Sequence, residues 1–137
     1  MSLVLDASLA LAWYFQDEAT ATTDAVLDRV AETGAVVPAL WRLELANGLQ
    51  VAVRRGRISP AYRDASLADL TQMRIETDSE TDVHAWSATL MLAEKHDLTL
   101  YDAAYLKLAQ RRRLPLATLD RGLRRAAGKL DLPVLGT

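Results

Sequence analysis

The sequence predicts an α/β domain in which a parallel sheet of four to five short strands is covered by helices. Short apolar runs, such as Ser2–Leu5 and Ala35–Val37, alternate with longer segments whose apolar residues recur at helical spacing. Strands that alternate with helices favour parallel pairing with right-handed crossovers. Two of the apolar runs end at an aspartate, Asp6 and Asp120, and a helix follows each. Such a sheet binds ligands at the carboxyl ends of its strands.

Local signals set the boundaries in the first half of the chain. The helix that follows Asp6 is apolar on most of its faces, so we expect it to be buried. Gly34 is a natural end for the second helix, and Pro38 closes the strand that comes next. Ser59 and Pro60 fit the N-cap and the first position of a further helix.

The second half predicts one long helix followed by two helix–strand units. Ser79 or Thr81 could cap the long helix, whose inner side would carry Val83, Trp86, Leu90 and Ala93. The expected strands are Ser2–Leu5, Ala35–Val37, Met73–Glu76, Pro115–Leu119 and Leu132–Leu135. The expected helices are Ser8–Phe15, Thr22–Glu32, Leu40–Arg55, Pro60–Gln72, Val83–His96, Asp102–Arg113 and Arg121–Ala127. The consecutive aromatic residues Trp13, Tyr14 and Phe15 are expected in the core or in a subunit contact, as are Trp41 and Trp86.

Length and composition indicate a single domain spanning residues 1–137. Half of the 137 residues are hydrophobic, which is enough for one packed core. The chain has no cysteine, which excludes disulfides and thiolate metal sites. The apolar start has no basic segment and is interrupted by Asp6, so we do not expect a signal peptide. No run reaches the roughly 18 apolar residues of a membrane span. We therefore expect a soluble, cytoplasmic protein.

The charge is distributed unevenly along the chain. The net charge of −2 argues against a general nucleic-acid binder. Residues 105–129 nevertheless carry eight basic side chains against one acid, Asp120. A basic surface beside an acidic cluster is typical of a site that handles phosphate backbones. Solvated helix faces are the alternative, and charge alone favours that interpretation. The basic residues are Lys107, Arg111, Arg112, Arg113, Arg121, Arg124, Arg125 and Lys129.

Four acids lie at the ends of expected strands or in the first turns of the helices that follow. They are Asp6, Glu44, Asp102 and Asp120. One such acid is more often a helix cap or a surface residue, but four at one sheet edge are a stronger signal. Asn47 shares a helix face with Glu44. Carboxylates held close together repel one another, and a bound cation relieves the repulsion.

Oxygen ligands without cysteine or histidine suit Mg²⁺ or Mn²⁺ better than zinc. An ion of this kind can polarise a phosphoryl oxygen and activate a water for in-line attack on a phosphodiester. We expect the neighbouring basic residues to hold the nucleic-acid backbone. The candidates are Arg112, Arg113, Arg121 and Arg124, with Arg54, Arg55 and Arg57 as weaker ones.

Three segments carry a family resemblance: LVLDAS, PALWRLELANGL and LTLYDAAYLKLAQRRRLPLATLD. In this order, over essentially the whole chain, they resemble the PIN-domain ribonucleases, and within these the VapC-type toxins of type II toxin–antitoxin pairs. The resemblance implies a Rossmann-like α/β/α sandwich and a Mg²⁺- or Mn²⁺-dependent endoribonuclease that acts on tRNA or rRNA. It also implies a homodimer and inhibition by a VapB-type antitoxin whose C-terminal tail enters or covers the groove.

The resemblance assigns roles to the acids and to three neighbouring polar residues. It implies that Asp6, Glu44 and Asp102 form the catalytic metal site and that Asp120 completes it. It further implies that Ser8, Asn47 and Thr118 support the site through hydrogen bonds. That supporting set is an expectation from the family alone.

Two other functions remain open from the residues. A phosphatase of the haloacid dehalogenase type also begins with an aspartate at a strand end, but it needs a second acid two residues later. Ser8 occupies that position here, and no suitably placed lysine is evident. The other alternative is a catalytically idle module that binds RNA or scaffolds a complex. Such a module has no need for four like charges in one place.

Overall fold

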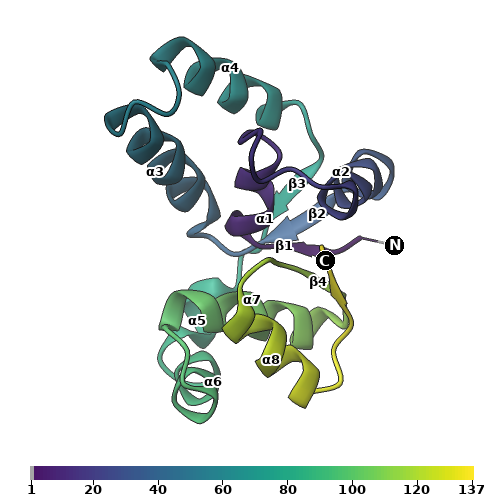
Figure 1. The fold of residues 1–137 in the computed structure, drawn as a ribbon. Helices are drawn as coiled ribbons and strands as arrows, with labels where there is room; N and C mark the ends of the chain where they lie inside the picture. Colours follow the sequence, from purple (N-terminus) through teal and green to yellow (C-terminus); the bar gives the residue numbers. More distant parts are fainter. Residues whose placement is uncertain (1) are drawn as a thin grey trace.

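A five-stranded, all-parallel sheet forms the centre of the molecule (Figure 1). The computed structural model describes residues 2–137. Val4 in the central strand pairs with Val36 on one side and with Leu116 on the other. The strands lie in the order β3 (Ile75–Thr77), β2 (Ala35–Val37), β1 (Val4–Leu5), β4 (Leu116–Ala117) and β5 (Val134–Leu135).

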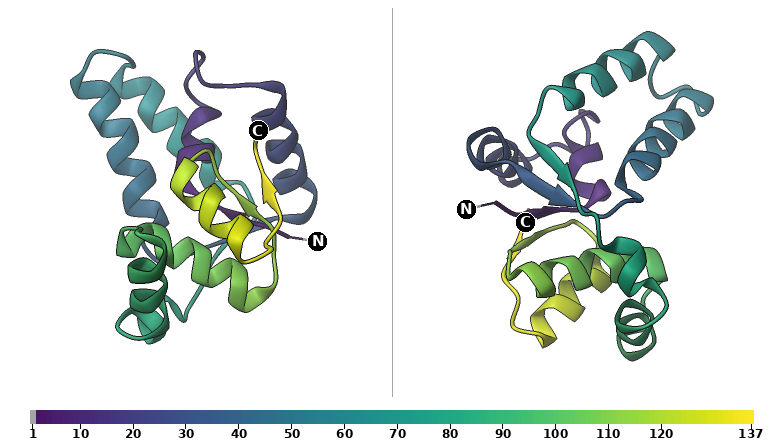
Figure 2. Two further views of the ribbon diagram at one scale, coloured as in Figure 1. Left: turned by 60° about the horizontal axis from the view of Figure 1, so that its bottom comes forward. Right: turned by 180° about the vertical axis from the view of Figure 1, so that it is seen from behind.

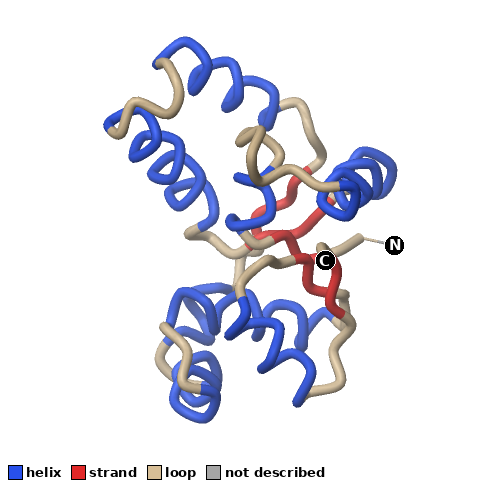
Figure 3. Tube along the Cα trace, in the orientation of Figure 1, coloured by secondary structure: helices blue, strands red, loops and turns tan. Residues whose placement is uncertain are grey.

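Helices cover both faces of this sheet (Figures 1 and 2). One layer holds α1 (Ala7–Ala12), α2 (Ala21–Thr33), α3 (Trp41–Arg54) and α4 (Pro60–Thr71). The other holds α5 (Thr81–Ala85), α6 (Ala88–His96), α7 (Leu100–Arg112) and α8 (Arg121–Lys129). Figure 3 shows how small the sheet is beside the helices. The predicted α/β sandwich with a short parallel sheet is confirmed.

The strand order creates a switch point between β1 and β4. From β1 the chain runs outward through β2 to β3, then returns to the centre and continues outward through β4 to β5 on the other side. The carboxyl ends of β1 and β4 flank the place where open parallel sheets bind ligands. Asp6 follows β1 directly, and Thr118 follows β4 directly.

Several predicted boundaries are confirmed by specific backbone contacts. The Ser59 hydroxyl accepts a hydrogen bond from the N–H of Tyr62 at 3.0 Å, with Pro60 at the first helical position. Gly34 ends α2 with a φ of +76°. A Cβ at this position would lie 2.8 Å from the carbonyl oxygen of Arg74, so both the backbone conformation and the packing require glycine.

The single long helix expected at 83–96 is wrong. The chain forms two helices, α5 and α6, with a break at Trp86. Of the residues expected on the inner side, Val83, Trp86 and Leu90 are 69%, 92% and 51% exposed, and Ala93 is buried. The predicted apolar face assumed one straight helix. Because the chain forms two helices with a break between them, that face does not match the buried side of α5 or of α6.

The expected caps of that helix are also wrong. Neither Ser79 nor Thr81 is the N-cap of α5, which is Glu80 without a side-chain hydrogen bond. The Thr81 hydroxyl instead accepts a hydrogen bond from the N–H of Ala39 at 3.0 Å. This contact ties the start of α5 to the loop that leads into α3.

The core is built around β1 and α7. Tyr105 and its apolar neighbours on α7 are buried against the central strand. Phe15 and Trp41 are buried, as expected for core aromatic residues, and Trp13 and Tyr14 pack against the core while partly exposed. No helix within residues 2–137 is both long and apolar enough to cross a bilayer.

An ion cluster around one buried carboxylate joins β3 to the C-terminal end of α7. The side chain of Asp78 is 2% exposed and accepts hydrogen bonds from the guanidinium groups of Arg111 and Arg112. Arg111 also pairs with Glu80, and Arg112 pairs with Glu76. Burial acts to raise the pKa of Asp78, but the two arginines outweigh it and hold that pKa below its usual value.

We expect Asp78→Asn to lower the free energy of unfolding at pH 7 by about 2–3 kcal/mol, because two guanidinium groups lose their buried acceptor. A pKa lowered by folding contributes stability above about pH 4 that is lost as the pH falls through the folded-state value. Urea unfolding should therefore show a smaller difference in the free energy of unfolding between Asp78→Asn and wild type at pH 3 than at pH 7. Asp82→Asn, at an exposed position on α5, is the control; an equal loss in both variants would contradict the expectation.

Candidate functional site

Asp6 lies at the switch point, directly after β1. Its side chain is buried, with the residue 4% exposed, and Oδ2 accepts two hydrogen bonds. Ser8 Oγ donates one at 2.6 Å, and Thr118 Oγ1 donates the other at 2.7 Å. Burial raises the pKa of Asp6, with a contribution from the charge of Asp120, although the two hydroxyl groups oppose the shift. The carboxylate is thus fixed in position without a cationic partner.

The same two hydroxyl groups connect Asp6 to the loop after β4. Ser8 Oγ accepts from the N–H of Leu119 at 3.2 Å, and Thr118 Oγ1 accepts from the N–H of Asp120 at 3.0 Å. Each hydroxyl therefore donates to Asp6 and accepts from the backbone that leads to Asp120. The structure places Ser8 and Thr118 where the family resemblance expected supporting hydrogen bonds.

Glu44 lies in the first turn of α3, partly buried. Its Oε1 accepts a hydrogen bond from Tyr105 Oη at 2.5 Å. Burial raises the pKa of Glu44, as do the charges of Asp6 and Asp102, while the Tyr105 hydroxyl lowers it. Asn47, one turn further along α3, is exposed and forms no side-chain hydrogen bond to another part of residues 2–137.

Asp102 and Asp120 each lie at the start of a helix. The N–H of Asp102, in the first turn of α7, donates to Thr99 Oγ1 at 3.1 Å. Asp120 is the N-cap of α8, and its Oδ2 accepts from the N–H of Leu123 at 2.8 Å. Burial and then the charges of Asp120 and Asp6 raise the pKa of Asp102 to about 6.

The four acids form one electrostatic group. Asp102 is affected by the charges of Asp6 and Asp120, and Glu44 by those of Asp6 and Asp102. Within residues 2–137, none of these carboxylates forms an ion pair with lysine, arginine or histidine. Uncompensated carboxylates of this kind fit a hard divalent cation such as Mg²⁺.

The four acids lie near one another, but their carboxylates do not converge on one position that a metal ion could occupy. Across the described part of the chain, no three His, Asp or Glu side chains lie close enough to hold one metal ion as they stand. Carboxylates repel one another, and Asp102 is partly exposed and has room to move, whereas Glu44 is held through Oε1 by Tyr105. One ion bound by three of them therefore requires side-chain movement towards Asp6.

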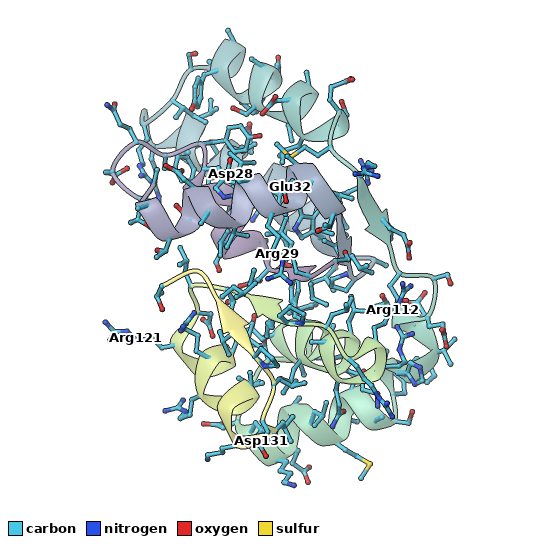
Figure 4. All side chains as sticks on the ribbon, turned by 90° about the vertical axis from the view of Figure 1, so that its right-hand side faces the viewer. Asp28, Arg29, Glu32, Arg112, Arg121 and Asp131 are labelled. Atoms are coloured by element: carbon cyan, nitrogen blue, oxygen red, sulfur yellow. The ribbon has the colours of Figure 1, made fainter. Side chains whose placement is uncertain are left out.

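The candidate RNA-binding arginines divide into two pairs. Arg112 is held by Glu76 and Asp78, and Arg124 Nη1 donates to the carbonyl oxygens of Thr118 and Leu135 at 2.8 and 3.2 Å. Arg113 and Arg121 are exposed. Figure 4 shows Arg121 projecting from the start of α8, at the opposite side of the molecule from Arg112. Their role in RNA binding remains a prediction.

Sequence reasoning missed Tyr105 as a contact of the site. Tyr105 lies on the buried side of α7, and the sequence pattern gave no partner for its hydroxyl group. Its spacing of three residues from Asp102 is the available signal, since residues three apart share a helix face. A polar tip on a buried residue next to a candidate acid indicates that the hydroxyl has a function.

We expect Asp102→Asn to stabilise the metal-free protein at pH 7.5 by about 1 kcal/mol. A pKa near 6 in the folded state, above its unfolded value, means that stability falls as the pH rises from about 4 to 6. Solvent screens the repulsion because the side chain is partly exposed, so the gain is smaller than the whole pKa shift would give. Urea unfolding in the presence of a chelator measures the effect, and the two proteins should converge near pH 4.

Asp28→Asn, which removes one negative charge from the exposed side of α2 (Figure 4), controls for net charge. A loss of stability in Asp102→Asn at pH 7.5, or a gain of equal size in Asp28→Asn, would contradict local repulsion at the site.

Comparisons with known proteins agree with this geometry. Residues 3–129 match the PIN domain family. The chain is 32% identical over 127 residues to Ribonuclease VapC3 of Pyrobaculum aerophilum, covering 90% of this chain and 92% of that protein.

Two solved structures share the fold. PAE2754 from Pyrobaculum aerophilum matches with a TM-score of 0.68 at 26% identity, over 92% of this chain and 79% of that one. VapBC2 from Rickettsia felis, solved with a DNA fragment from its promoter, matches with a TM-score of 0.63 at 14% identity, over 98% and 97%. The chain therefore belongs to the PIN domain family and, within it, to the VapC-type ribonucleases of toxin–antitoxin systems.

Proposed function

We propose that the protein is a divalent-metal-dependent endoribonuclease that cleaves tRNA or rRNA in the cytoplasm. The observation that carries this proposal is the group of four carboxylates at the switch point, which has no cationic partner within residues 2–137. The similarity to Ribonuclease VapC3 over most of the chain supports RNA as the substrate. An idle scaffolding module would gain nothing from this repulsion.

Asp6, Glu44, Asp102 and Asp120 would hold the cation, Mg²⁺ or Mn²⁺. When bound, the ion supplies positive charge to the scissile phosphate and makes the attacking water more acidic. Asp6 is the fixed member of the set, because Ser8 and Thr118 hold its Oδ2.

The other three acids differ in how much freedom they retain. Asp120 keeps one oxygen on the N–H of Leu123, so it can offer the other without releasing α8. Asp102 is partly exposed and can adjust to the ion and to RNA, whereas Glu44 is held through Oε1 by Tyr105 and has Oε2 to offer. Arg113 and Arg121 are exposed and would contact the RNA backbone.

A VapB-type antitoxin and a second copy of the chain are the proposed protein partners. The structural likeness to VapBC2 from Rickettsia felis supports an antitoxin. A homodimer is supported by five large apolar side chains that the monomer leaves exposed on or beside α5 and α6. We refer to them together as the α5–α6 surface: Val83, Trp86, Leu90, Met91 and Tyr101. Apolar surfaces of this kind mark association sites.

We expect Asp102→Asn to lower the rate of RNA cleavage by at least about 100-fold, the order of loss when a group that stabilises transition-state charge is removed. Purified protein is incubated with total RNA, with isolated tRNA and with isolated rRNA, each with Mn²⁺ or with a chelator. Asp28→Asn, which is remote from the acids, should cut like wild type. Cleavage by Asp102→Asn at the wild-type rate, or cleavage that persists in chelator, would refute the proposal.

We expect Trp86→Glu to shift the protein from dimer to monomer, because it replaces the most exposed apolar side chain of the α5–α6 surface with a charge. Sedimentation equilibrium measures the mass in solution. Ala31→Glu, at an exposed position of α2 on the other side of the sheet, should leave the dimer intact. A monomeric wild type, or a Trp86→Glu variant that remains dimeric, would show that this surface does not join two copies.

A further inference from the structure

Tyr105 connects the two helices that carry Glu44 and Asp102. It is fully buried on α7, three residues after Asp102, and its Oη donates to Glu44 Oε1 on α3 at 2.5 Å. α3 and α7 belong to opposite helical layers (Figure 1). The phenol therefore bridges the layers at the edge of the sheet where the acids gather.

We propose that Tyr105 is a positioning residue of the metal site, which holds Glu44 by Oε1 and leaves Oε2 to contact the divalent cation. The proposal rests on the function proposed above, since it assigns Tyr105 a role towards the same ion. It also predicts that Glu44 binds through one oxygen, because the other is occupied by a buried donor.

The surroundings of the hydroxyl favour this role over simple core packing. The side chain is fully buried on α7, and a phenol is a protonated donor at neutral pH. A phenylalanine would fill the same apolar volume without a polar atom to satisfy. The hydroxyl instead points to a carboxylate that repulsion from Asp6 and Asp102 would push away. The contact thus retains Glu44 within the acidic group.

The chain contains a matched control for this contact. Tyr14 Oη donates to Asp69 Oδ2 at 2.7 Å, which is the same kind of phenol–carboxylate hydrogen bond. It joins the segment after α1 to α4, and within residues 2–137 neither residue forms a hydrogen bond with one of the four acids. A Tyr→Phe substitution removes the same hydroxyl group at either position. Only the hydroxyl of Tyr105 is hydrogen-bonded to a candidate metal ligand, Glu44.

Calorimetric titration of Mn²⁺ into metal-stripped protein tests the proposal without relying on activity. We expect Tyr105→Phe to weaken Mn²⁺ binding by about 10-fold or more, the usual effect of removing a group that orients a metal ligand. Tyr14→Phe should bind Mn²⁺ like wild type. Unfolding curves in chelator check that both variants are folded, and the phenylalanine ring retains the packing of the core.

A double-mutant cycle tests whether Tyr105 acts through Glu44. In a Glu44→Gln background, Tyr105→Phe should cause no further loss of Mn²⁺ affinity, because the carboxylate that it positions is gone. In cleavage assays at saturating Mn²⁺, Tyr105→Phe should lower kcat and leave KM for RNA unchanged, since a fully buried phenol cannot touch the substrate.

The outcomes separate this inference from the function on which it rests. If wild type binds Mn²⁺ and Asp102→Asn does not, the metal site stands. Equal Mn²⁺ affinity in Tyr105→Phe and wild type would then overturn the role of Tyr105 alone, as would a further loss in the Glu44→Gln background. If wild type binds no Mn²⁺, the metal site is wrong and the inference is overturned with it.

Discussion

Repulsion among four carboxylates is the constraint around which this part of the molecule is built. Asp6 is buried without a counter-ion, and it is held by two hydroxyl groups that also bind the backbone after β4. Glu44 is held by a phenol from the opposite helical layer. These neutral donors fix the acids in position and leave their charges uncompensated. A lysine or arginine in the same places would neutralise the group and remove its attraction for a cation.

Arginines fill the opposite role in the rest of the structure. Asp78, which is as buried as Asp6, is paired with Arg111 and Arg112, and its pKa moves in the opposite direction. Asp6 follows β1 and Asp78 follows β3, two strands of the same sheet with β2 between them, and the two aspartates differ in the partners that they receive. Asp78, which stabilises the fold, is paired with arginines, whereas Asp6, at the switch point, accepts hydrogen bonds from hydroxyl groups.

The local sequence was sufficient to predict the fold class and the placement of the acids, because both depend on short patterns. The strand Ala35–Val37 has the predicted bounds, and the acids do lie at strand ends and in first helical turns. The break at Trp86 was missed, since helical periodicity continues through it. The partners of Tyr105, Arg112 and Arg124 were missed because each contact depends on how distant elements pack, which spacing within one helix does not encode.

The pairing of β1 with β4 has a consequence for when the site can form. Val4 pairs with Leu116, and Asp6 receives a hydrogen bond from Thr118, across more than a hundred residues of intervening chain. Contacts so distant in sequence form late and slowly, because a long loop must close before they contribute stability. During synthesis, Asp6 cannot form its hydrogen bond with Thr118 until almost the whole chain has left the ribosome. The acidic centre is therefore a property of nearly the whole fold, and an N-terminal fragment that ends before residue 118 lacks it.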